Sequence, residues 1–102
     1  MGFNVILEDE DGATLEELDD SQNLLTTILP SYDEKSFHHL RFVDPYGDTV
    51  FNRPQMEAFM EEWQRLASKP QWADAKEIHR RVATLAKRCN DEVHLYLRFR
   101  GE

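Results

Sequence analysis

The stretch from Trp72 to Arg100, WADAKEIHRRVATLAKRCNDEVHLYLRFR, contains two periodicities that decide the fold class. In its first part, apolar residues recur three and four positions apart, which predicts one face of an amphipathic helix ending near Asn90. These residues are Ala75, Ile78, Val82, Leu85, Ala86 and Cys89. From Val93 to Phe99 every second residue is apolar, which is typical of an antiparallel strand with one buried face. The stretch therefore predicts a helix followed by a half-buried strand.

A second helix is predicted immediately before this stretch. Asn52 and Gln55 form an approximate capping box, and Pro54 lies in the first turn, where proline is tolerated. The apolar face of this helix is expected to comprise Met56, Phe59, Met60, Trp63, Leu66 and Ala67. The polar side chains, Glu62 among them, are expected on the other faces.

Two apolar segments before this helix predict a β-hairpin. Residues 38–43 (HHLRFV) and 49–51 (TVF) flank the turn sequence DPYGD at 44–48. The proline at its second position and the glycine at its fourth suit a type I turn followed by a bulge. We expect Phe42 to face Val50 across this hairpin.

The N-terminal third predicts a strand and a short helix. Apolar residues at alternate positions from Phe3 to Leu7 indicate the strand. The turn pair at residues 11–12 then either closes a hairpin onto residues 13–15 or leads into a loop. Four apolar residues at helical spacing follow Asp20 and Ser21, either of which can cap the helix. They are Leu24, Leu25, Ile28 and Leu29, and Pro30 ends the helix.

Together these elements predict a single α+β domain spanning residues 1–102. The chain is too short for two ordinary domains, and its 40% of apolar residues excludes a disordered chain. A small antiparallel or mixed sheet of three to four strands, with two main helices packed on one face, would bury every apolar stripe.

The formal net charge of −8 is concentrated in residues 8–20, which hold eight acids and no bases, whereas the rest of the chain has 12 of each. Clustered charge steers the encounter with an oppositely charged partner. We therefore expect a protein-binding surface for a basic partner, with exposed aromatics such as Tyr32, Tyr46 or Trp72 as anchors. Its acidic residues are Glu8, Asp9, Glu10, Asp11, Glu16, Glu17, Asp19 and Asp20.

Two alternatives for the acidic run involve no binding to a different protein. The first is a solvated acidic loop. The second is that these acids face the chain's own bases, because residues 65–100 hold nine bases and four acids. Such pairing would occur within one chain or across a homodimer. The overall negative charge disfavours nucleic acid as the partner.

No catalytic residue, metal ligand or cofactor is predicted. Known catalytic and nucleotide-binding motifs are absent, and an EF-hand alignment of the acidic run places Leu7 and Leu18 where carboxylates are required. Asp44 and Asp48 are expected to cap their own turn rather than act as an acid–base pair. Cys89, the single cysteine, is expected to be a buried apolar residue.

A small metal-dependent enzyme is the alternative from another functional class. His38 and His39 are adjacent in a predicted strand and point to opposite faces, so they are not expected to share an ion. His39 and His94 could meet on neighbouring strands and form a site with two ligands. A tight, stoichiometric metal site would favour this alternative over protein binding.

Residues 42–52 (FVDPYGDTVFN), the helix after them and the LYL of the last strand resemble small uncharacterised bacterial proteins over residues 37–102. This resemblance implies a bacterial origin but no activity and no functional residue. Small size and acidity are also typical of immunity and inhibitor proteins, an analogy of charge and not of motif. The N-terminus lacks the features of a signal peptide and no apolar run is long enough to span a membrane, so a cytoplasmic location is expected.

Overall fold

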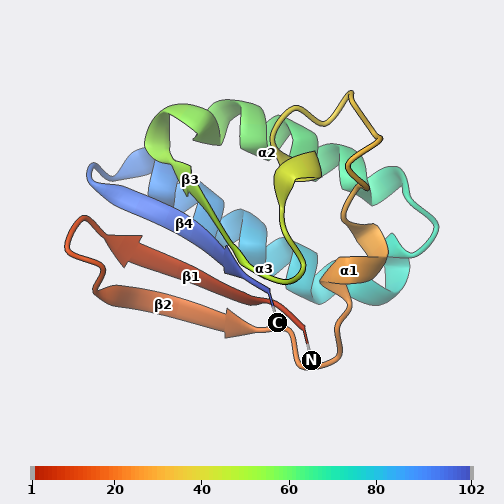
Figure 1. The fold of residues 1–102 in the computed structure, drawn as a ribbon, viewed down its shortest axis with the longest axis horizontal. Coiled ribbons are helices and arrows are strands. Elements are labelled where there is room, and N and C mark those ends of the chain that lie inside the picture. Colours follow the sequence, from red (N-terminus) through yellow and green to blue (C-terminus); the bar gives the residue numbers. More distant parts are fainter. Residues whose placement is uncertain (1, 102) are drawn as a thin grey trace.

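The computed structural model describes residues 2–101, which form one four-stranded sheet and two main helices. The strands are β1 (Asn4–Asp9), β2 (Thr14–Asp19), β3 (Asp48–Asn52) and β4 (Leu95–Arg100). The helices are α1 (Leu25–Ile28), α2 (Met56–Arg65) and α3 (Trp72–Asp91), with short 3₁₀ turns at Leu40–Phe42, Arg53–Gln55 and Leu66–Ser68. The strand order is β2-β1-β4-β3, and each neighbouring pair is antiparallel. With α2 and α3 on one face of the sheet, the predicted α+β class is confirmed (Figure 1).

The core lies between the sheet and the two main helices. Val5, Leu7, Leu97 and Phe99 alternate along the two central strands and are fully buried. All six residues predicted for the apolar face of α3 are buried as well. The prediction for α2 is wrong at Ala67, which is exposed. Ala67 falls in the 3₁₀ turn, where three residues per turn instead of 3.6 rotate it away from the apolar face.

A reciprocal contact joins α2 to α3. The indole Nε1 of Trp63 donates a hydrogen bond to the backbone oxygen of His79 at 3.0 Å, and Nε2 of His79 lies 2.7 Å from the backbone oxygen of Trp63. Since a carbonyl oxygen only accepts, Nε2 of His79 carries the hydrogen. The two rings stack with centroids 5.1 Å apart. His79 is therefore a packing residue of the helix pair.

The predicted hairpin between residues 38–43 and 49–51 is wrong. Residues 40–42 form a 3₁₀ turn, β3 pairs with β4 instead, and Phe42 is 51% exposed rather than facing Val50. The backbone N–H groups of His39 and Leu40 donate to the carboxylate of Glu62 in α2 and so have a partner without a strand. The hydrogen-bonding partner of β3 is β4, whose alternate residues are buried.

A turn forms at residues 44–47, but Gly47 does not adopt the positive φ that the expected bulge requires. The carboxylate of Asp44 accepts a hydrogen bond from the backbone N–H of Tyr46 at 2.8 Å, which confirms the capping role expected of Asp44. Asp48 behaves differently, because its carboxylate lies 2.8 Å from Nη1 of Arg98 on the neighbouring strand. Asp44 and Asp48 therefore have separate structural partners.

The N-terminal hairpin, one of the two alternatives for residues 8–15, is present. Gly12 has φ +83°, a conformation that glycine adopts without strain, and the carboxylate of Asp9 accepts from the N–H groups of Asp11 and Ala13. The second strand runs to Asp19, further than residues 13–15. Because β2 pairs with β1 alone, it forms one edge of the sheet (Figure 1). No helix among residues 2–101 has the length and apolar character needed to cross a membrane.

Candidate partner-binding surface

The outer strand β2 carries the second half of the acidic run at the edge of the sheet. Leu18 is paired with Val5 and faces the helices, where it is 6% exposed. Because strand residues alternate between faces, Glu17 and Asp19 point to the opposite face, which no helix covers. Five of the six residues of β2 are exposed. The acidic run is therefore largely an ordered strand rather than a loop.

Three of the eight acids predicted to bind a partner have roles inside the fold. Asp20 is 3% exposed, and its two carboxylate oxygens accept from the N–H groups of Leu24 and Leu25 at 2.9 and 2.7 Å. The N-cap position of α1 is Leu24, so neither Asp20 nor Ser21 is the N-cap residue, but the carboxylate of Asp20 holds the first N–H groups of the helix. Asp9 orders the hairpin turn, and Glu8, at 8% exposed, accepts from Nε of Arg98 at 2.8 Å.

Two more acids contact bases from the C-terminal part of the chain. Glu16 lies 2.7 Å from Nη1 of Arg88 in α3, and Glu10 lies 3.2 Å from Nδ1 of His94. The pairs of Glu8 with Arg98 and of Glu16 with Arg88 confirm, within one chain, that part of the acidic run faces the chain's own bases.

The ion pairs of Arg98 run across the open face of the sheet. Its guanidinium joins Glu8 of β1 to Asp48 of β3, at 2.8 Å in each case. The hydrogen bond to Glu8, together with the one to Asp48, raises the pKa of Arg98 above its usual value. Because Arg98 pairs with Glu8 and Asp48, it does not form an ion pair with the acids of β2.

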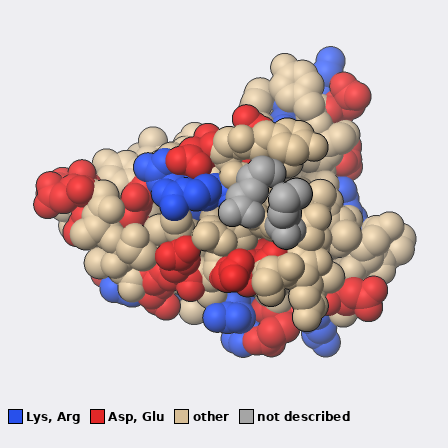
Figure 2. All heavy atoms as spheres, turned by 60° about the horizontal axis from the view of Figure 1, so that its bottom comes forward, with Lys and Arg blue, Asp and Glu red and all other residues tan. Residues whose placement is uncertain are grey.

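Four of the eight acids are exposed and have no Lys or Arg partner among residues 2–101, although Glu10 contacts the imidazole of His94. We refer to them as the hairpin carboxylates: Glu10, Asp11, Glu17 and Asp19. Among residues 2–101, no Lys or Arg nitrogen lies within 4.0 Å of any of them. Asn4 donates one hydrogen bond to Glu17 at 3.0 Å. Figure 2 shows acidic side chains at the left end and along the front of the molecule, with Lys and Arg groups between them.

The histidines have separate environments. Neither His39 nor His94 lies in a strand, and the two rings contact different carboxylates, those of Glu62 and Glu10. Within residues 2–101, no group of three or more His, Cys, Asp or Glu side chains has the arrangement of a metal site. The geometry therefore offers nothing that favours a two-histidine metal site.

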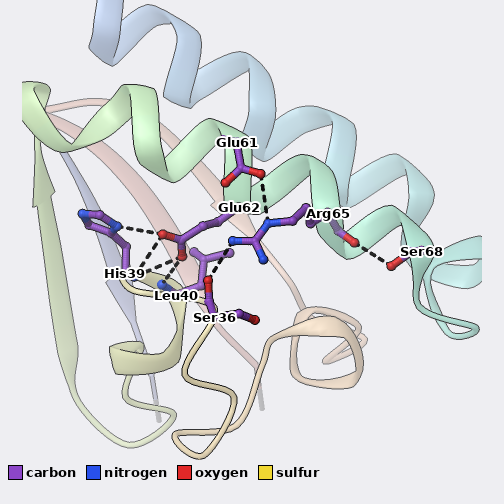
Figure 3. Close-up of polar contacts among 7 residues, drawn as sticks. All are labelled: Ser36, His39, Leu40, Glu61, Glu62, Arg65 and Ser68. Atoms are coloured by element: carbon purple, nitrogen blue, oxygen red, sulfur yellow. Dashed lines mark hydrogen bonds and ion pairs between the residues drawn. The ribbon is translucent and has the colours of Figure 1, made fainter.

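Glu62 is a buried carboxylate that the helix pattern did not identify. Its side chain, 3% exposed, accepts from the backbone N–H groups of His39 and Leu40 at 3.0 Å and lies 2.8 Å from Nδ1 of His39 (Figure 3). Burial acts to raise the pKa of Glu62, but these hydrogen bonds outweigh it and hold the pKa below the usual value. Glu62 lies three positions after Phe59 and four before Leu66, a spacing that does place it on the buried face.

Arg65 holds the same segment from one turn further along α2. Its Nη2 donates to the backbone oxygen of Ser36 at 2.9 Å, and its Nε lies 3.0 Å from the carboxylate of Glu61, one helical turn earlier (Figure 3). Its guanidinium also lies over the ring of Phe37. Glu62 and Arg65 therefore attach residues 36–40 to the helix, which is a structural role.

A shallow groove lies at the other end of β1 from the hairpin turn. It has a volume of about 330 Å³, and its lining includes Phe3, Leu29, Tyr32 and Arg41. The guanidinium of Arg41 lies 4.5 Å from the centre of the Tyr32 ring. Of the aromatic anchors predicted from sequence, Tyr32 and Tyr46 are 61% and 84% exposed, and Trp72 is partly buried. None of the three lies in the hairpin that carries the acids.

Comparisons with protein-family models, curated proteins and solved structures gave no match for this chain. A function for the chain is therefore inferred from the geometry of its described residues.

Proposed function

We propose that this chain is a binding module that recognises a basic protein partner through the hairpin carboxylates. The observation that carries the proposal is the division of the acidic run. Glu8, Asp9 and Asp20 are used by the fold, whereas the four hairpin carboxylates are exposed and, within residues 2–101, have no Lys or Arg within 4.0 Å. The recognition surface is therefore narrower than residues 8–20.

The positions of these carboxylates favour a cationic partner. Glu17 and Asp19 are two residues apart on one strand, so their side chains lie on the same face of the sheet and repel each other. A Lys or Arg from a partner would relieve this repulsion and would be attracted from a distance. Together with the size of the chain, this chemistry supports an inhibitor or immunity-type protein that covers a basic surface.

The test compares two variants that lose the same number of charges. The hairpin variant carries Glu10→Gln, Asp11→Asn, Glu17→Gln and Asp19→Asn. The control variant carries Asp33→Asn, Glu57→Gln, Glu61→Gln and Asp74→Asn, all at exposed positions outside the hairpin. Each protein is used to capture partners from lysate of the source cell. The affinity of every retained protein is then measured with purified components over a range of salt concentrations.

We expect one basic protein to bind the wild type and the control variant with similar affinity. The hairpin variant should bind it at least about tenfold more weakly, and the affinity of the wild type should fall as salt rises, because exposed ion pairs are screened. Equal affinity of the two variants for every retained protein would overturn the proposal.

A further inference from the structure

The main chain of β2 has hydrogen-bonding groups on its outer edge. The N–H of Asp20 donates to the backbone oxygen of Phe3, which makes these two residues a hydrogen-bonded pair. In an antiparallel ladder such pairs alternate, so Leu18 and Glu16 bond to β1 and the N–H and C=O groups of Glu17 and Asp19 point away from it. The irregularity in this ladder lies between Leu7 and Glu8, toward the turn, and does not disturb this alternation.

The two edges of the sheet differ in what lies beside them. Along β3, the hydroxyl of Thr49 accepts from the N–H of Asp44 and approaches the backbone oxygen of Phe42, so residues 42–44 flank that edge. Along β2, residues 2–101 make no backbone hydrogen bond to Glu17 or Asp19 outside the ladder with β1. The outer edge of β2 is therefore the one with main-chain groups open to a partner.

A groove lies beyond the end of this edge, between the segment after β2 and α3. It has a volume of about 250 Å³ and lies between the end of β2 and α3, with Asp19, Leu24, Ile78 and Arg81 in its lining. Leu18 points to the same side of the sheet. A strand placed next to β2 would direct every second side chain to the helix side of the sheet and the others to the face of Glu17 and Asp19.

We propose that β2 accepts an extended segment of the basic partner as a fifth strand of the sheet. This inference rests on the proposed function and specifies how the partner binds. The partner residues hydrogen-bonded to Glu17 and Asp19 would lie on the same face as those carboxylates, at a Cα separation of about 5.5 Å. Lys or Arg is favoured at these two positions, and an apolar residue between them would lie beside Leu18 on the helix side of the sheet. The recognised sequence is basic–apolar–basic.

The charges of β2 select this partner over a second copy of the chain. Two β2 strands paired edge to edge would bring the acids of one copy against the acids of the other, and like charges opposite each other destabilise a sheet. Charged residues on an edge strand are a common protection against such self-pairing. A basic strand removes this repulsion, so the same residues that oppose self-association favour the partner.

The inference is tested with a synthetic peptide of alternating valine and lysine as the probe. One derivative is N-methylated at every lysine, which removes the N–H groups that would face β2 when the lysines face Glu17 and Asp19. The matched control is N-methylated at every valine, whose N–H groups would point away. Both derivatives keep all side-chain charges. Binding is followed by isothermal titration calorimetry and by hydrogen exchange of the Glu17 and Asp19 amides.

We expect the unmodified peptide and the valine-methylated control to bind alike and to slow exchange at both amides. The lysine-methylated peptide should bind at least about tenfold more weakly, since each lost hydrogen bond is worth about 1 kcal/mol. Equal binding of both derivatives with loss of binding in the hairpin variant would overturn strand addition and leave carboxylate recognition standing. Absence of binding at about 1 mM peptide would overturn strand addition, and the capture experiment would then decide the proposed function separately.

Discussion

At the scale of single residues, Glu62 is the most consequential polar group in the core. Its carboxylate satisfies three N–H groups of residues 39 and 40. Glu62→Gln would place an amide NH₂ against some of these donors and remove the charge that strengthens the others. We expect a loss of about 2 kcal/mol in the free energy of unfolding at pH 7, measured with urea. Glu61→Gln, on the exposed side of the same helix, should change it by less than about 0.5 kcal/mol.

The stability difference between wild type and Glu62→Gln should depend on pH. The folded-state pKa of Glu62 lies below the usual value of 4.5, because the hydrogen bonds from His39 and Leu40 outweigh the effect of burial. A lowered folded pKa stabilises the protein fully above about pH 4.5, and this stabilisation is lost as pH falls through the folded pKa. The difference should thus narrow as pH falls from about 5 toward about 3. A difference that stays constant over the whole range would contradict this account.

Cys89 should be chemically inert in the folded protein. The residue is fully buried, and this burial raises the pKa of its thiol to about 11. Because the thiolate is the reactive form, we expect alkylation at pH 8 to be at least about 100-fold slower in the native protein than in urea. Reaction at similar rates in the two states would show that the thiol is accessible and would contradict the packing described for α3.

At the scale of elements, Asp20 connects β2 to α1. Its buried carboxylate accepts from two N–H groups at the start of the helix. We expect Asp20→Ala to lower the free energy of unfolding by about 1–2 kcal/mol, because two N–H groups at the start of α1 would lose their acceptor. Asp19→Ala, at the neighbouring exposed position, should have an effect below about 0.5 kcal/mol. Similar losses for the two variants would mean that α1 does not depend on the carboxylate of Asp20.

Elements with local patterns could be predicted from the sequence. The stripe of α3, the alternation of β4 and the capping box of Asn52 and Gln55 are local patterns, and each is present. The alternation begins at Leu95 and not at Val93, which lies in the turn before β4 and is 61% exposed. The strand expected at residues 38–43 is absent because its backbone donors bind Glu62, which lies 23 positions from His39. Contacts at that separation leave no periodic pattern in the sequence.

The candidate surface was predictable as a region but not residue by residue. Eight acids without a base within residues 8–20 indicated the hairpin as charged. The sequence did not show that Glu8 would pair with Arg98, 90 positions away, or that the carboxylate of Asp20 would be buried and so unavailable to a partner. Removal of these two side chains would destabilise the fold, and a loss of binding could then result from unfolding instead of from the lost charge. The hairpin variant therefore leaves both unchanged.

At the scale of the whole molecule, the four hairpin carboxylates add charge without contributing to the core. The net charge of −8 already opposes compaction, and these side chains lack a Lys or Arg partner within residues 2–101. We expect the free energy of unfolding of the hairpin variant to lie within about 1 kcal/mol of that of the wild type, or to exceed it. Thermal unfolding monitored by circular dichroism provides this measurement. A loss above about 2 kcal/mol would show that these carboxylates are structural.

The central claim is that the partner binds at the β1–β2 hairpin and the edge of β2. The most direct test is an amide chemical-shift map of the ¹⁵N-labelled chain during titration with the captured basic partner. We expect the largest shifts at residues 10–19, and loss of these shifts in the hairpin variant. Shifts centred on Tyr32 and Arg41, with the hairpin unaffected, would contradict binding at the hairpin. They would place the binding surface at the groove lined by Phe3, Tyr32 and Arg41.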